Sequence, residues 1–120
     1  MARTLAVVRD LLFRGKISAT AQALGVPVAF CAPQALVARV LEEKPSLVIV
    51  DLNGKGDAEL AAVTELKKSN NTVHVLGFFG HVNTEVAQRA KTCGFDRVIP
   101  NSVFSEQLPE ILGGDTSNSR

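Results

Sequence analysis

Short apolar runs alternate with longer stretches of helical periodicity along this chain. The runs at residues 4–9, 27–32, 47–50, 72–77 and 96–100 predict five β-strands. After each run, apolar residues recur every three or four positions, which predicts five helices. Parallel strands need such helical crossovers, so the alternation favours an α/β fold. We expect one doubly wound parallel sheet in the order 2-1-3-4-5, a flavodoxin-like three-layer sandwich.

The strongest strand signal is the segment PSLVIVDLNG, residues 45–54. Four successive apolar residues at its centre are typical of a strand that helices cover on both faces. We therefore expect Val48–Val50 to be the most buried stretch. The run ends in Asp51, and open α/β sheets bind ligands outside the carboxyl ends of their strands. Asp51 is thus the first candidate site residue.

Several residues predict where helices begin and end. Asp10 and Asp57 are expected N-caps, and Gly25 stands where a left-handed C-terminal cap belongs. Pro109 lies late in the last predicted helix, although proline is tolerated only in the first helical turn. We therefore expect an irregular turn over residues 102–105 or a kink at Pro109.

Composition, charge and cysteine content indicate a single globular domain. The chain has 120 residues, 46% of them hydrophobic, so we expect one domain over residues 1–112 and a disordered polar tail over 113–120. A net charge of +1 gives no electrostatic case for nucleic acid. No apolar stretch is long enough for a bilayer or a signal peptide, so we expect a cytoplasmic protein without membrane contact. Cys31 and Cys93 form no CxxC pair and are predicted to be buried, reduced thiols.

Two stretches carry a family resemblance. LVIVDLN resembles the strand that ends in the phosphoacceptor aspartate in the receiver domains of bacterial response regulators. AKTCGFDRVIPNSV resembles the receiver stretch that leads through a short strand into Lys-Pro. The resemblance covers about residues 4–112 and implies a CheY-like fold and two-component phosphorelay signalling. It places Asp51 at the phosphoacceptor position.

Three of the four functional receiver positions depart from the family pattern. The acidic pair after the first strand is Arg9–Asp10 here. The hydroxyl position after the fourth strand falls on Phe79 or Gly80, and the lysine position falls on Asn101. A phosphoaspartate would therefore lose its charge-assisted partners and its switch. The resemblance implies a degenerate receiver (a pseudo-receiver): a signalling or protein-interaction module, not an enzyme.

Polar residues gather at the predicted carboxyl edge of the sheet: Arg9, Asp10, Arg14, Asn53 and His81. They form either an anion-binding or internally neutralised site, or a set of solvated charges. His81 is either a proton switch or ligand, or a structural hydrogen-bonding residue. Both alternatives stay open at this stage.

Asp10 and Asp51 could supply two carboxylates to Mg²⁺, although Arg9 would compete with the metal. We expect no cofactor, and at most weak Mg²⁺ binding. The first and third strands should be neighbours, so we expect the Arg9 guanidinium to form a two-pronged ion pair with Asp51. The alternative is that Arg9 turns to solvent and Asp10 alone approaches Asp51.

Three functions follow from these residues. The first is the degenerate receiver with an unknown protein partner, able to form a homodimer through its fourth helix, fifth strand and fifth helix. The second is a small-molecule or nucleotide binder that uses the basic edge near Arg9 and Arg14. The third is an atypical receiver that is still phosphorylated at Asp51. Fold alone does not choose among them.

Overall fold

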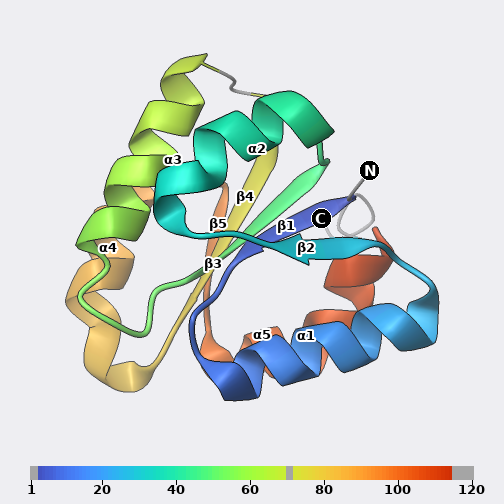
Figure 1. Cartoon of the computed structure of the whole chain (residues 1–120). Coiled ribbons are helices and arrows are strands. Elements are labelled where there is room, and N and C mark those ends of the chain that lie inside the picture. Colours follow the sequence, from blue (N-terminus) through green and yellow to red (C-terminus); the bar gives the residue numbers. More distant parts are fainter. Residues whose placement is uncertain (1–2, 70–71, 115–120) are drawn as a thin grey trace.

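The computed structural model describes residues 3–69 and 72–114 and alternates strands with helices throughout (Figure 1). The strands are β1 (Thr4–Val7), β2 (Val28–Phe30), β3 (Leu47–Asp51), β4 (His74–Phe79) and β5 (Arg97–Pro100). The helices are α1 (Leu11–Leu24), α2 (Leu36–Glu43), α3 (Asp57–Ser69), α4 (Thr84–Thr92) and α5 (Asn101–Gly113). The 3₁₀ turns η1 (Pro33–Ala35) and η2 (His81–Asn83) lead into α2 and α4.

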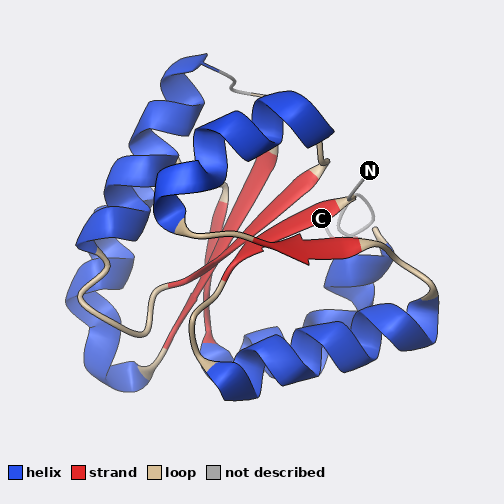
Figure 2. Cartoon of the chain, viewed as in Figure 1, coloured by secondary structure: helices blue, strands red, loops and turns tan. Residues whose placement is uncertain are grey.

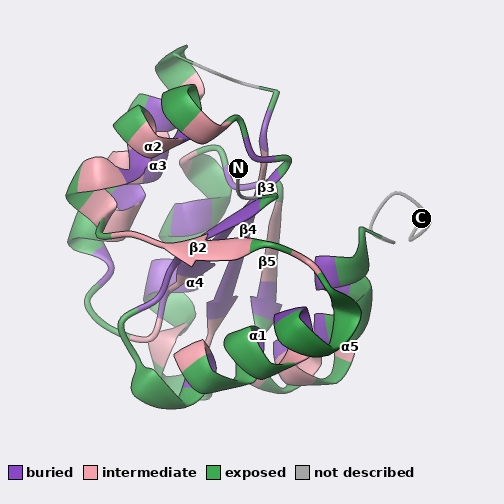
Figure 3. Ribbon diagram, turned by 45° about the vertical axis from the view of Figure 1, so that its right-hand side comes forward, coloured by how far each residue is buried: buried purple, intermediate pink, exposed green. Residues whose placement is uncertain are grey.

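The strands form one sheet in the order β2-β1-β3-β4-β5, and every neighbouring pair is parallel. The predicted fold and strand order are confirmed. Helices cover both faces of the sheet (Figure 2): α1 and α5 pack on one face, and α2, α3 and α4 on the other. Val48, Ile49 and Val50 are fully buried at the centre of the sheet, as expected (Figure 3).

Three phenylalanine rings join α1, β4 and α5. The Phe78 and Phe104 rings stack with centroids 4.0 Å apart, and Phe13 packs against Phe78 with centroids 4.8 Å apart. Phe78 and Phe104 are completely buried. This contact brings the first and last helices together over the end of β4.

β4 begins and ends two residues later than predicted, because Phe78 and Phe79 continue the strand instead of opening a loop. Phe78 pairs in register with Asp51 and buries its ring among the apolar residues of one face. Phe79 packs partly buried on the opposite face. The alternation of the two rings across the sheet explains why the strand extends to Phe79.

The expectation for the last helix is wrong. α5 runs without a break from Asn101 to Gly113, with Pro109 inside it. Pro109 itself is exposed, while Leu108 and Ile111 on either side of it are buried. Burial of this apolar face offsets the hydrogen bond that proline cannot donate.

Of the three predicted caps, those at Asp10 and Gly25 are confirmed and that at Asp57 is wrong. The Asp10 carboxylate accepts hydrogen bonds from the backbone N–H groups of Leu12 and Phe13, and Gly25 closes α1 with φ 70°. Asp57 is the first residue of α3 and not the residue before it.

Two further expectations concern the thiols and the ends of the chain. Cys31 and Cys93 are free thiols but half-buried, not fully buried as expected. The tail was expected to begin at residue 113, but Gly113 is the last residue of α5 and Gly114 caps it. Residues 115–120 of the expected tail lie outside the described residues. Among the described helices, none combines the length and apolarity that a bilayer crossing requires.

Candidate functional site

The carboxyl ends of the strands bring the candidate residues to one edge of the sheet. β1 pairs with β3, β3 with β4, and β4 with β5, so the residues that follow these strands converge. Asp51 is the last residue of β3, and Asn101 is the first residue of α5, directly after β5. This edge holds the polar residues predicted from the sequence.

Asp51 is held by amide groups. Its Oδ1 accepts a hydrogen bond from the Asn53 backbone N–H at 2.9 Å and another from the Asn53 Nδ2 at 2.8 Å. Both donors are neutral, and they come from the turn that immediately follows β3. The carboxylate therefore has a fixed orientation without a cation among its hydrogen-bond donors.

Asn53 and Asn101 form a reciprocal amide pair. Asn53 Nδ2 donates to Asn101 Oδ1 at 3.0 Å, and Asn101 Nδ2 donates to Asn53 Oδ1 at 3.0 Å. One Asn53 side-chain proton thus serves Asp51 and the other serves Asn101. A continuous polar chain links the end of β3 to the start of α5. Both asparagines were candidates from the sequence, but their pairing across 48 positions was not predicted.

Gly80 lies against this amide pair. A Cβ at Gly80 would stand 3.0 Å from Asn53 Oδ1 and 3.2 Å from Asn101 Nδ2, closer than ordinary contacts. The position therefore favours a residue without a side chain. Phe79 packs against the core, and His81 is exposed and opens η2.

Arg9 does not bind Asp51, so that expectation is wrong. Its Nη2 lies 4.0 Å from the Glu59 Oε2, and its side chain is 84% exposed. β1 ends at Val7, so the chain has already left the sheet at Arg9, which reaches the first turn of α3 instead. Asp10 is occupied as the N-cap of α1.

A cavity of about 490 Å³, here called the Asp51 cavity, opens at this edge. Its lining residues are Arg9, Asp10, Asp51 and residues 53–59. Four carboxylates face two cations there, and one of them, that of Asp57, also contacts Arg89 at 3.2 Å. Asp10 and Asp51 are the residues that could offer oxygen to Mg²⁺. Across the described residues, no group of three or more histidine, cysteine or acidic side chains is arranged to hold a metal.

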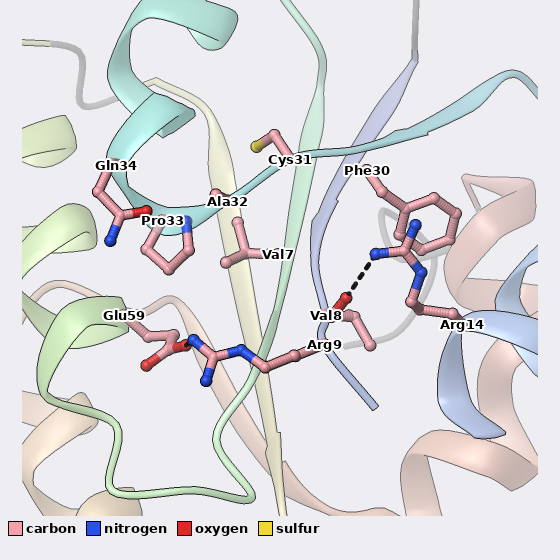
Figure 4. Close-up of a pocket in the computed structure, with 10 residues that line it drawn as sticks. All are labelled: Val7, Val8, Arg9, Arg14, Phe30, Cys31, Ala32, Pro33, Gln34 and Glu59. Atoms are coloured by element: carbon pink, nitrogen blue, oxygen red, sulfur yellow. Dashed lines mark hydrogen bonds and ion pairs between the residues drawn. The ribbon is translucent and has the colours of Figure 1, made fainter. Parts of the chain in front are cut away.

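A second cavity of about 350 Å³, here called the Arg14 cavity, lies beside the first (Figure 4). It sits outside the ends of β1 and β2, against η1. The Arg14 guanidinium stacks over the Phe30 ring at 4.4 Å and donates to the Val8 carbonyl at 3.2 Å. Arg9 and Glu59 line both cavities.

Cys31 also lines the Arg14 cavity. Burial raises the pKa of the Cys31 thiol, and the nearby Arg39 charge opposes this change only in part. The thiolate is the nucleophilic form, so this cysteine is a weak nucleophile at neutral pH. The geometry supports a lining role for Cys31 and not a catalytic one.

No protein-family model matches this sequence, and no curated protein sequence matches it significantly. Solved structures do match. The receiver domain of NtrX from Brucella abortus superposes with a TM-score of 0.76 at 23% identity, covering 97% of this chain and 99% of that one. A longer NtrX structure from the same organism matches with a TM-score of 0.75 at 23% identity. The match covers 100% of this chain but only 28% of that one.

The chemotaxis response regulator CheY4 of Vibrio cholerae matches with a TM-score of 0.74 at 22% identity, covering 93% of this chain and 96% of that one. At these identities the likeness establishes the fold. The chain has the CheY-like receiver fold, and Asp51, Asn53 and Asn101 meet at the carboxyl edge of its sheet.

Proposed function

We propose that this chain is a degenerate receiver, a signalling module that acts through a protein partner and is not phosphorylated in the usual way at Asp51. The fold supports the receiver part of the proposal. The residues at the carboxyl edge support the degenerate part, because Asn101 stands at the lysine position and Phe79 or Gly80 at the hydroxyl position of the receiver pattern.

The observation that carries the proposal is the Asn53–Asn101 amide pair. Asn101 stands at the position that resembles the receiver lysine, but it binds Asn53 and carries no charge. A phosphoryl group on Asp51 would add negative charge beside two neutral amides and a cavity rich in carboxylates. The free energy that drives a phosphorylation switch comes largely from new charge-assisted bonds, and this edge offers few of them.

Acetyl phosphate with Mg²⁺ tests this proposal by intact mass. We expect no phosphoryl adduct on the wild-type chain. The informative comparison is a variant that carries Arg9→Asp, Phe79→Thr and Asn101→Lys together, which restores the receiver pattern and should gain an adduct. An Mg²⁺-dependent adduct on the wild type that disappears in Asp51→Asn would contradict the proposal and favour the atypical receiver.

The protein partner could be a second copy of this chain, bound through α4, β5 and α5. Two cations of this face already have partners within the chain: Arg89 contacts Asp57 at 3.2 Å and Arg97 donates to Gln107 at 3.3 Å. A homodimer would therefore rely on other groups of the face, such as Lys91 and Glu106. Light scattering at high protein concentration measures the molar mass, and the mass of a monomer would contradict the homodimer.

A further inference from the structure

The Arg14 cavity combines two arginines and one carboxylate, that of Glu59, with apolar side chains. Arg9 and Arg14 both line it, and the Val7, Ala32 and Pro33 side chains lie on the side away from Arg14 and Phe30 (Figure 4). Its volume of about 350 Å³ lies in the range of small-molecule sites. The degenerate-receiver proposal does not use this cavity.

Arg14 is preorganised to receive an anion. Its guanidinium lies over the Phe30 ring, 4.4 Å from the ring centroid, and one N–H donates to the Val8 carbonyl. A guanidinium has five N–H donors in a fixed fork that matches a carboxylate, so a fixed guanidinium loses little side-chain entropy on binding. Arg14 is the fourth residue of α1, and its side chain bonds to the Val8 carbonyl after β1, so helix and strand end together hold it in place.

Arg9 is the adjustable member of the pair. Its contact with Glu59 is long, at 4.0 Å, and its side chain is largely in solvent. The pair is exposed on the Arg9 side alone, because the Glu59 side chain is only 15% exposed. Arg9 can turn toward an anion in the cavity, and doing so leaves the largely buried Glu59 carboxylate without this cation.

We propose that the Arg14 cavity binds a small organic anion: a carboxylate attached to a compact apolar or aromatic body. The carboxylate binds the Arg14 and Arg9 guanidinium groups, and the body packs against Pro33 and Val7. The Gln34 amide lies at the same rim and can bind a further polar group. The apolar walls disfavour a bare inorganic anion, because they would leave part of its hydration shell unreplaced.

Binding at this cavity reaches the Asp51 edge through shared residues. Arg9 and Glu59 line both cavities, so an anion that takes Arg9 leaves Glu59 without its cation. The Asp51 cavity then becomes more negative. A small anion thus provides a signal input that does not depend on phosphorylation of Asp51.

The two cysteines provide a direct test with benzoate as the probe. Cys31 lines the Arg14 cavity, whereas Cys93 lies at the end of α4 and serves as an internal control. We expect benzoate to slow alkylation of Cys31 by iodoacetamide several-fold and saturably at mildly alkaline pH, with no change at Cys93. Benzyl alcohol, which keeps the ring without the charge, and inorganic phosphate, which keeps charge without the ring, should both fail to protect.

Two variants make the test specific. Arg14→Gln should abolish the protection, and Lys16→Gln should keep it, because Lys16 lies on the same helix but does not line the cavity. Circular dichroism establishes that both variants fold. Amide NMR shifts at Val8 and Phe30 during a benzoate titration give a second readout. Absence of saturable shifts, equal protection by benzyl alcohol or phosphate, or protection that survives Arg14→Gln would overturn the proposal. None of these outcomes depends on whether Asp51 accepts a phosphoryl group.

Discussion

At the scale of single residues, the hydrogen-bond donors to Asp51 are neutral amide groups. Asn53 donates to Asp51 and exchanges hydrogen bonds with Asn101, so the carboxylate is oriented without a lysine. A hydrogen bond to a charged group is worth about 1.5–3 kcal/mol. The amide donors therefore satisfy Asp51 well, and none of its described hydrogen-bond donors carries a charge.

Gly80 makes this arrangement testable. Gly80→Ser should lower the free energy of unfolding by about 1–3 kcal/mol, because the new Cβ would press on the Asn53 and Asn101 side chains. Urea denaturation measures the change. Gly54→Ser is the matched control, because nothing lies within 4 Å of a Cβ there. Equal effects of the two substitutions would show that Gly80 is not closely packed against the amide pair.

At the scale of elements, α5 shows that tertiary burial can override a helix-breaking residue. Phe104, Leu108, Ile111 and Leu112 are all buried, and together they hold the helix on both sides of Pro109. The chain still lacks one helical hydrogen bond at this point. The last helix is thus formed by its packing and not by its local propensity.

Pro109→Ala should therefore raise the free energy of unfolding, by up to about 3 kcal/mol, since it restores the missing donor at an exposed position. Pro33→Ala is the comparison, because Pro33 occupies the first turn of η1, where proline is tolerated. We expect little change or a small loss there. The thermal midpoint of each variant measures the effect, and a Pro109→Ala protein no more stable than the wild type would contradict this account of α5.

The sequence predicted the elements better than their contacts. Apolar runs and the caps at Asp10 and Gly25 are local signals, so strand order and most helices followed from them. The end of β4 was predicted too early, because the sequence Phe78-Phe79-Gly80 was interpreted as a loop. The structure shows that the two rings pack on opposite faces of the sheet, as successive strand residues do.

The site was predicted residue by residue but not as a network. Asn53 and Asn101 are 48 positions apart, and an amide pair of that kind has no local pattern. The prediction that Arg9 pairs with Asp51 was wrong, because the actual partner, Glu59, lies on α3. The short distance between Arg9 and Glu59 depends on how α3 packs, which the sequence does not show. Long-range side-chain contacts depend on packing that periodicity does not encode.

At the scale of the whole molecule, one ion pair links the stability of the fold to pH. Burial opposes ionisation of Asp96, but hydrogen bonds from the Val75 N–H and from Lys67 outweigh it and hold the pKa of Asp96 below its ordinary value. Since the pKa is lower in the folded state, this stabilisation is present above the unfolded pKa of about 3.9 and is lost as pH falls through the folded pKa.

Asp96→Asn should consequently be less stable than the wild type at neutral pH, and the difference should shrink as the pH falls below about 4. Denaturant midpoints over a pH series measure it. Asp57→Asn is the control, because Asp57 forms an exposed ion pair with Arg89 and should change stability little. A stability difference for Asp96→Asn that stays constant into acid would refute the assignment.

Neutral amides satisfy the Asp51 carboxylate, and we propose that this hydrogen-bond network does not respond to phosphorylation. The most direct measurement is an NMR titration with Mg²⁺ and beryllofluoride, a mimic of a phosphoryl group on aspartate. The side-chain amide signals of Asn53 and Asn101 report on the network itself. We expect the chemical shifts of both side-chain amides to stay unchanged in the wild type at millimolar Mg²⁺ and beryllofluoride. Saturable shifts of both amides that are absent in Asp51→Asn would contradict this expectation.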